Sequence, residues 1–246
     1  MNNIKSKERY LTIAGSLKLN NKILLSEFKI NINLKEWNTI IGQSGLGKST
    51  LLKTIANLEI PQNFSHSIKV NNQNLYKFSW MAQDDLLLPW LTVIENVFLG
   101  ESLRREKINF DKAYNLLNKV GLTSVANNLP STLSGGMKQR VALARTLFED
   151  NDIILMDEPF TSLDSATKMH IQELAFSLLK DKTVLMVTHD PLEALVLSNS
   201  LYIITNKNIQ NIKLPKTLPL REINKDNITY SYNNILKIIQ KSYEEQ

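Results

Sequence analysis

The chain has 246 residues, 43% of them hydrophobic, so it can bury a full core as one α/β domain with room for a small subdomain. Its net charge of +5 comes from basic residues scattered among asparagines and acidic residues, which favours a solvated surface over a nucleic-acid interface. Cysteine is absent, which excludes disulfides and thiolate chemistry, and no apolar stretch approaches the roughly 18 residues of a membrane-spanning helix. Residues 1–9 lack the apolar core of a secretory signal, so we expect a cytoplasmic protein.

The N-terminal part of the chain is predicted to be mainly β-structure. Residues 10–19 form a first candidate strand, and residues 27–34 alternate apolar and polar side chains in the two-residue period of a second. Asn20-Asn21 predicts the turn between them. Short strands near residues 68–72 and 79–81 would complete a small antiparallel sheet.

A glycine-containing loop follows the next predicted strand, residues 37–41, and precedes a predicted helix from residue 51. It fits the spacing G-x-x-x-x-G-K-[ST], in which backbone N–H groups turn inward around a phosphate and the helix N-terminus adds its dipole. The loop consists of Gly42, Gln43, Ser44, Gly45, Leu46, Gly47, Lys48, Ser49 and Thr50. Lys48 is expected to reach the β- and γ-phosphate oxygens, and the Ser49 hydroxyl to ligate Mg²⁺. Because kinases, GTPases and motor ATPases share this loop, it predicts nucleotide binding but no particular reaction.

A helical region is predicted from about residue 84 to residue 149. Within it, residues 111–120 are amphipathic and end at Gly121, a plausible C-cap. Ser134 is a good N-cap for the last helix. One face of that helix carries Met137, Val141, Ala144 and Phe148.

The start of this last helix has two interpretations. As structure alone, it is a capped helix that follows a glycine turn. However, Ser134, Gly135 and Gly136 also leave a hydroxyl and bare N–H groups at the positive end of a helix, which predicts a second anion site.

The C-terminal half alternates apolar strands with a helix. Residues 152–156 and 183–187 are continuous apolar runs, as expected of strands that are buried on both faces. Between them, residues 165–179 carry a helical stripe of Met169, Leu174 and Leu178, so we predict a right-handed crossover in a parallel sheet. A terminal hairpin is predicted within residues 201–214, and a last helix at about residues 224–243. Its apolar face would comprise Ile228, Tyr232, Ile235 and Ile239.

Residues 133–140, Leu-Ser-Gly-Gly-Met-Lys-Gln-Arg, resemble the signature sequence of the ATP-binding subunits of ABC transporters. The order of motifs is similar to that family from about residue 20 to residue 191. The resemblance implies a single ABC-type ATPase domain: an α/β P-loop NTPase fold with a RecA-like parallel-sheet core, a small antiparallel β subdomain and the helical region inserted as a subdomain. It also implies ATP and Mg²⁺ as ligands. In that family two domains pair head to tail, as a homodimer or with a paired ATPase subunit, so Ser134, Gly135 and Gly136 would cover the γ-phosphate held by the other copy.

Three further segments resemble catalytic motifs of that family. Residues 153–159 resemble its Walker B segment, in which Asp157 would hold Mg²⁺ and Glu158 would be the general base or orient the attacking water. Acidic residues that cap a following helix are the structural alternative. Gln83 resembles the glutamine that contacts Mg²⁺ and the attacking water, and His189 resembles the histidine that reaches the γ-phosphate. Taken singly, a surface glutamine and a structural histidine would be ordinary.

Two positions concern the partner copy and the base. Residues 162–164 resemble the family's D-loop, which touches the opposite subunit. Leu19 departs from the family pattern, because an aromatic ring commonly stacks on adenine at that position. We therefore expect apolar rather than stacked packing of the adenine.

Residues 84–93, which include Leu88-Pro89-Trp90, are similar to the nitrate, sulfonate and taurine importer branch, which includes carriers of a thiamine-precursor pyrimidine. That branch implies transmembrane permease subunits, a periplasmic or surface solute-binding protein and a place on the inner face of the cell membrane. The leucine and tryptophan side chains could form a groove for a permease helix, or pack in the helical core. The rival functions are a soluble ABC-type ATPase without a membrane partner and a small-molecule kinase, in which residues 133–140 would have no role.

Overall fold

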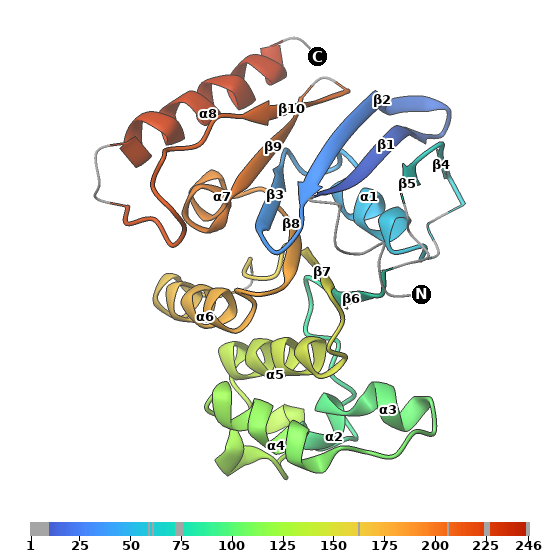
Figure 1. The fold of residues 1–246 in the computed structure, drawn as a ribbon, viewed down its shortest axis with the longest axis vertical. Helices are drawn as coiled ribbons and strands as arrows, with labels where there is room; N and C mark the ends of the chain where they lie inside the picture. Colours follow the sequence, from blue (N-terminus) through green and yellow to red (C-terminus); the bar gives the residue numbers. More distant parts are fainter. Residues whose placement is uncertain are drawn as a thin grey trace. The chain divides into compact units, whose positions relative to one another are not determined.

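A computed structural model of the protein describes residues 10–58, 60, 62–71, 76–161, 163–205, 207–223 and 227–244. These residues form two units (Figure 1). The first unit comprises the chain up to Tyr76 and from Leu179 onward, and the second unit runs from Lys77 to Leu178. The expectations for residues 1–9 and Ser162 fall outside the described residues. Of the helices that the structure describes, none is both long and apolar enough to span a bilayer.

The first unit contains the predicted antiparallel sheet. Strand β1 (Tyr10–Leu19) pairs with β2 (Lys22–Asn33) on one side and with the short strands β4 (Phe64–His66) and β5 (Lys69–Val70) on the other. The predicted turn is also confirmed, since Asn20 and Asn21 have φ angles of 48° and 64°. Positive φ at both central residues is what a tight hairpin turn requires.

The same unit contains four strands in the order β10-β9-β3-β8. Strand β3 (Trp37–Ile41) lies parallel to both β8 (Thr183–Thr188) and β9 (Ser200–Thr205). Strand β10 (Asn208–Ile212) pairs antiparallel with β9, as the predicted hairpin requires. Every residue of β3 and β8 is buried, which explains why their sequences do not alternate.

Three helices accompany these strands: α1 (Lys48–Ile55), α7 (Pro191–Leu197) and α8 (Asn227–Glu244). In Figure 1, α8 lies beside β9 and β10. Its buried Ile228 and Ile235 share a core cluster with Ala194 and Leu195 of α7 and with apolar residues of β9. The predicted apolar face of the last helix is confirmed, with its first described residue at Asn227.

The second unit begins with strand β6 (Phe78–Met81), which pairs with β7 (Ile153–Asp157). This pairing is parallel, so the prediction that residues 79–81 belong to the small antiparallel sheet is wrong. The physical reason is that Ser79 and Met81 are buried on one side of the strand, beside the fully buried β7. A short strand sequence carries no information about which partner supplies that burial.

The remaining elements of the second unit are helical. They are α2 (Val93–Val97), α3 (Leu99–Leu103), α4 (Phe110–Lys119), η2 (Thr123–Val125), η3 (Pro130–Thr132), α5 (Gly135–Phe148) and α6 (Ser165–Leu178). Figure 1 shows α5 lying between α6 and the α2–α4 group. Val141, Ala144 and Phe148 of α5 are buried in this core and Met137 packs against it, which confirms the predicted face.

The stripe predicted for α6 is only partly correct. Leu174 and Leu178 pack against the helical core, but Met169 is 58% exposed. The fully buried positions of α6 are Ile171 and Ala175, which are four residues apart and therefore lie on one face. Met169 belongs to a neighbouring face, so hydrophobicity alone misassigned it.

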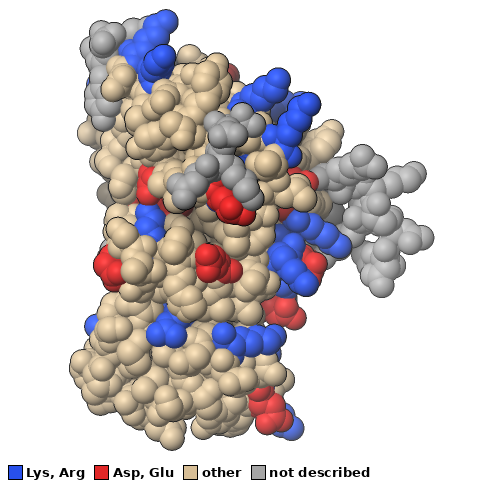
Figure 2. Space-filling view, turned by 90° about the vertical axis from the view of Figure 1, so that its left-hand side faces the viewer, with Lys and Arg blue, Asp and Glu red and all other residues tan. Residues whose placement is uncertain are grey.

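Charged side chains on the surface are interspersed. On the face shown in Figure 2, lysine and arginine side chains alternate with aspartate and glutamate side chains rather than gathering in one patch. One ion-pair cluster joins Arg104 to Glu106 and Glu149 at 2.9 Å each. Exposed pairs of this kind contribute little to stability.

Phe148→Ala is expected to lower the free energy of unfolding by about 3–5 kcal/mol, because it empties a filled position in the helical core. Phe110→Ala is the matched control: Phe110 is 53% exposed and makes an edge contact with Phe98, so we expect a loss of about 1 kcal/mol. Urea unfolding of the two variants measures both values. Equal losses would contradict the assignment of Phe148 as a core residue.

Candidate functional site

The loop predicted to hold phosphate joins the end of β3 to the start of α1 in the first unit. Gly45 and Gly47 have φ angles of 84° and 81°, a backbone region that favours glycine. Gly47 is also the N-cap of α1, and a Cβ atom there would lie 2.7 Å from Leu17 Cδ2. The backbone conformation therefore favours glycine at 47, and the nearby Leu17 side chain adds to this preference. The first N–H groups of α1 have no carbonyl of their own helix to bind. They are suited to an anion.

Two polar side chains fix the conformation of this loop. Lys48 is buried, and its Nζ donates hydrogen bonds of 2.9 Å to the carbonyl oxygens of Gly42 and Gln43. The ammonium is thus folded into the loop, where it can exchange a carbonyl for a phosphate oxygen, a stronger charge-assisted acceptor. Gln43 Nε2 in turn donates to Ser242 Oγ of α8 at 3.2 Å. Ser49, the expected Mg²⁺ ligand, is half-buried in the first turn of α1.

His189 follows the last residue of β8 and is exposed. The residues on either side of it are fixed: the Asp190 N–H donates to Thr188 Oγ1 at 3.1 Å, and Thr188 Oγ1 donates to the Glu193 carboxylate. Asp190 Oδ1 also accepts the N–H groups of Leu192 and Glu193, which caps α7. The capped turn holds the backbone of His189 in place.

The phosphate loop and His189 leave neighbouring strands at the same end. In the parallel β3–β8 pair, Ile41 is the register partner of Thr188. The loop therefore begins directly after one member of this pair, and His189 directly after the other. The carboxyl edge of a parallel sheet is where ligands of α/β proteins usually bind.

Leu19 occupies the position at which the family pattern has an aromatic residue. It is the half-buried last residue of β1. Its register partner on β4 is Phe64, which is also half-buried. Partners in an antiparallel pair project on the same face of the sheet, so an aromatic ring is present one strand away from the expected position. Phe64 could not be found from the sequence, because the pairing of two strands whose residues are 45 positions apart leaves no local signal.

The predicted acidic residues lie in the second unit. Asp157 is the buried last residue of β7, and Glu158 follows it with a φ angle of 46°. Thr161 Oγ1 donates to Glu158 Oε2 at 3.3 Å. Because Met81 of β6 is the register partner of Met156 of β7, the exposed Gln83 leaves the same edge as the two acidic residues. The structure therefore brings Gln83, Asp157 and Glu158 to one strand edge.

The second predicted anion site is the N-terminus of α5. Ser134 is the N-cap, and its Oγ accepts the Met137 N–H at 3.3 Å. Ser134 and Gly135 are exposed, and a Cβ atom on Gly135 would meet no atom within 4 Å. A Cβ atom on Gly136 would instead lie 2.5 Å from Thr167 Cγ2 of α6. The two glycines thus have different roles, since Gly135 leaves open space and Gly136 allows close helix packing.

The same helix is connected to the acidic residues. Gln139 is buried, and its Nε2 donates to the carbonyl oxygen of Pro159, directly after Glu158. Asp164 accepts the Thr167 N–H at 3.1 Å and caps α6, and the hydrogen bonds from Thr167 lower the pKa of the Asp164 carboxyl. Asp164, which belongs to the described part of the expected D-loop, therefore also caps a helix.

Two side chains, Arg145 and Asn96, hold the backbone of residues 85–92 in place. Neither residue was among the sequence predictions. Arg145 of α5 donates to the carbonyl oxygens of Asp85 and Leu86 at 2.6 Å and 2.8 Å. Burial lowers the pKa of Arg145, although arginine stays charged at physiological pH. Asn96 of α2 is fully buried and makes four hydrogen bonds of 2.8–3.2 Å to backbone groups of Leu88, Leu91 and Thr92. A buried asparagine within an apolar helical run was the available signal.

The outer side of this segment is apolar and exposed. Trp90 is 70% exposed and Leu86 is 60% exposed, and Leu86 has a φ angle of 46°. Core packing, the alternative considered for Trp90, is therefore wrong, because Asn96 and Arg145 hold the backbone while the ring points outward. The segment is a preformed, partly apolar surface.

Comparisons with known proteins consistently identify ATP-binding proteins of ABC transporters as relatives of this chain. A family model for the ABC transporter domain matches residues 25–161. An uncharacterised ABC transporter ATP-binding protein of Haemophilus influenzae is 39% identical over 220 residues, which cover 87% of this chain and 91% of that protein. An aliphatic sulfonates import ATP-binding protein of Rhodococcus jostii is 40% identical over 80% of this chain and 79% of its own length. A protein of the same description from Bacillus cereus is 38% identical over 75% of this chain and 74% of its own.

A solved ABC transporter in an inward-facing conformation has the same fold. It aligns with a TM-score of 0.71 and 22% identity, and the alignment covers 92% of this chain and 90% of the other. At this identity the likeness concerns the fold alone.

Gly136→Ala is expected to lower the free energy of unfolding by about 1–2 kcal/mol, because its methyl group would overlap Thr167 Cγ2. Gly135→Ala is the matched control and should be neutral in stability, since open space lies in front of it. Thermal unfolding compares the two. Adding Thr167→Ser should restore stability to Gly136→Ala, and failure of this rescue would contradict the assigned contact.

Proposed function

Because this chain belongs to the ATP-binding proteins of the ABC transporter family, we propose that it is the ATP-hydrolysing subunit of an importer for small organic anions of the aliphatic sulfonate class. The chain is an ATPase with the predicted ABC-type α/β fold. Relatives at 38–40% identity that are described as sulfonate import ATP-binding proteins support the solute class.

One observation carries the proposed mode of action: the N-terminus of α5 is a capped helix end with an exposed serine and an exposed glycine that faces open space. Such an end is built to bind an anion. The chain already has a phosphate loop, so a second outward-facing phosphate site suits a nucleotide that is held by another copy. We therefore propose a head-to-tail pair in which Ser134, Gly135 and Gly136 contact the γ-phosphate bound at the partner's loop.

The residues of each unit fit ATP and Mg²⁺. The left-handed glycines and the inward-folded Lys48 form a cradle for phosphate oxygens, and Ser49 offers a hydroxyl in the first turn of α1. Asp157 is a buried carboxylate at a strand end, a group that a cation would stabilise. We propose Ser49, Gln83 and Asp157 as the protein ligands of Mg²⁺, which neutralises phosphate charge when bound.

Hydrolysis would need a group that accepts a proton from water. Glu158 is the candidate, because it follows the buried Asp157 and is positioned by its left-handed backbone and by Thr161. We propose that Glu158 orients the attacking water and accepts its proton, while His189 donates a hydrogen bond to the transferred phosphoryl group. Release of phosphate would remove the contact that only the ATP state shares between two copies, so the pair would open.

The exposed apolar side of the 85–92 segment supports a membrane partner. The hydrogen-bonded backbone holds Trp90 and Leu86 outward, and Gln83 of the proposed site lies two residues before the segment. We propose that a short cytoplasmic helix of a permease subunit docks here, which would place the chain on the inner face of the membrane. A solute-binding protein would deliver the anion to the permease.

Glu158→Gln should keep ATP binding but lower ATP turnover by about 10²-fold or more, because the amide cannot accept the proton. The variant should also accumulate as an ATP-bound dimer, which size-exclusion chromatography with ATP and Mg²⁺ would detect. Glu173→Gln removes the same charge from the exposed side of α6 and is the control. Normal hydrolysis by Glu158→Gln would show that another group is the base.

Co-purification from native membranes tests the permease proposal. A multi-span membrane protein should be recovered with the wild-type chain, and Leu86→Ser with Trp90→Ala should lower its recovery about tenfold through loss of buried apolar area. Leu103→Ser is the control, since Leu103 is 74% exposed on α3 of the same unit. Recovery of no membrane protein with the wild-type chain would favour the rival function, a soluble ABC-type ATPase.

A further inference from the structure

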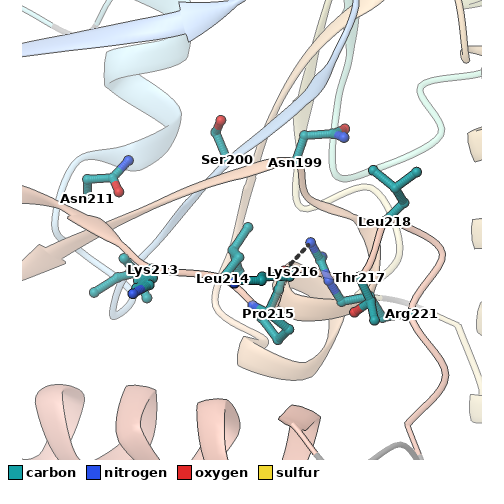
Figure 3. Close-up of a pocket in the computed structure, with 11 residues that line it drawn as sticks. Asn199, Ser200, Asn211, Lys213, Leu214, Pro215, Lys216, Thr217, Leu218 and Arg221 are labelled. Carbon is teal, nitrogen blue, oxygen red and sulfur yellow. Dashed lines mark hydrogen bonds between the residues drawn. The ribbon is translucent and has the colours of Figure 1, made fainter.

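A separate pocket of about 300 Å³ lies in the first unit, between the start of β9, the end of β10 and the chain that follows β10 (Figure 3). Its volume is at the lower end of the range for small-molecule sites. Its lining comes from residues 199–200, 211–218 and 221. None of the residues of the proposed ATPase site belongs to this set.

Arg221 is the built part of this pocket. It is only 6% exposed, and its Nη1 donates to the carbonyl oxygens of Leu195 and Ser198, both at 2.7 Å. Its Nη2 makes a long contact of 3.5 Å with the Pro215 carbonyl oxygen, drawn in Figure 3. The buried Nε–H has no acceptor among the residues that the structure describes. The side chain thus ties the end of α7 to the segment after β10 and still has unused hydrogen-bonding capacity.

The charge of Arg221 is not balanced within the pocket. All its acceptors are neutral carbonyl groups, and the lining contains no aspartate or glutamate. Burial lowers the pKa of Arg221, but a guanidinium stays protonated at physiological pH, so its positive charge remains. A buried charge without a counter-charge is costly, and an anion nearby would reduce that cost.

Two lysines add positive charge to the lining of the pocket. Lys213 and Lys216 are exposed and line the same pocket as Arg221. Asn199 uses its Oδ1 to accept the Trp37 N–H at 3.0 Å, so its amide nitrogen is a further donor. Leu214, Pro215 and Leu218 supply apolar surface beside these groups, as labelled in Figure 3.

A purely structural role for Arg221 explains only part of this arrangement. Two bonds from Nη1 to the end of α7 would suffice for a clamp that also benefits from the helix dipole. A clamp does not account for an open pocket next to the guanidinium, nor for three cations lining it without an acidic residue. Both observations are explained if the missing counter-charge comes from solution.

We propose that this pocket binds a small oxyanion, such as phosphate or a small phosphate or sulfonate compound, with the buried Arg221 as a fixed charge in its lining and the exposed Lys213 and Lys216 as additional charges. Oxyanions accept several charge-assisted hydrogen bonds at once, which suits a site made only of donors. The site is independent of ATP turnover. Its absence would therefore leave the proposed function unaffected.

The test follows the Arg221 Nε–H signal by ¹⁵N–¹H NMR while inorganic phosphate is added to the full chain at constant ionic strength. This signal reports only on the pocket, so phosphate at the Gly42–Thr50 loop would not be mistaken for binding here. We expect a saturable shift for phosphate and none for chloride. Arg221→Lys, which removes the signal, assigns it.

Lys213→Gln with Lys216→Gln should weaken the phosphate affinity about five- to tenfold, because two exposed charge-assisted contacts are lost. Lys22→Gln with Lys29→Gln removes the same charge from exposed positions of β2 and should leave the affinity unchanged. The proposal is overturned if phosphate produces no saturable shift in the wild-type chain, or if both double variants bind it equally well.

Discussion

Parallel pairing of strands is the constraint on which the arrangement of the functional residues depends. In the first unit, Ile41 pairs with Thr188, and in the second unit, Met81 pairs with Met156. Each pairing brings two loops that are far apart in the sequence to one sheet edge: the phosphate loop with His189, and Gln83 with Asp157 and Glu158. Strands β7 and β8 can consist mainly of apolar residues because both their faces are covered, and the polar functional residues follow at their ends.

Three cationic side chains hold loops in place by donating hydrogen bonds to backbone carbonyl groups. Lys48 closes the phosphate loop, Arg145 holds the start of the 85–92 segment, and Arg221 ties the chain after β10 to the end of α7. A charged donor makes a stronger hydrogen bond than a neutral one, yet a neutral acceptor leaves the charge itself uncompensated. Such residues can therefore position the backbone and attract an anion at the same time.

The sequence predicted the elements whose signals are local. The G-x-x-x-x-G-K-[ST] spacing located the loop, the alternation in β2 and the turn at Asn20-Asn21 located the hairpin, and Ser134 located the start of α5. Prediction from the sequence failed where the structure depends on the pairing of distant segments. The partner of β6 and the position of Phe64 opposite Leu19 both depend on contacts that a single sequence does not show. Met169 was misassigned because it is apolar, although it lies outside the buried face of α6.

The hydrogen bond between Gln43 and Ser242 joins the phosphate loop to the last full turns of α8. Ser242 is buried, and its own hydroxyl donates to the Ile239 carbonyl oxygen at 2.6 Å, so the bond ends on a well-packed part of that helix. Thermodynamic linkage is reciprocal. A nucleotide that strengthens or weakens the Gln43–Ser242 bond therefore changes the stability of the C-terminal helix, and a partner that stabilises that helix through the same bond changes the nucleotide affinity of the loop by the same factor.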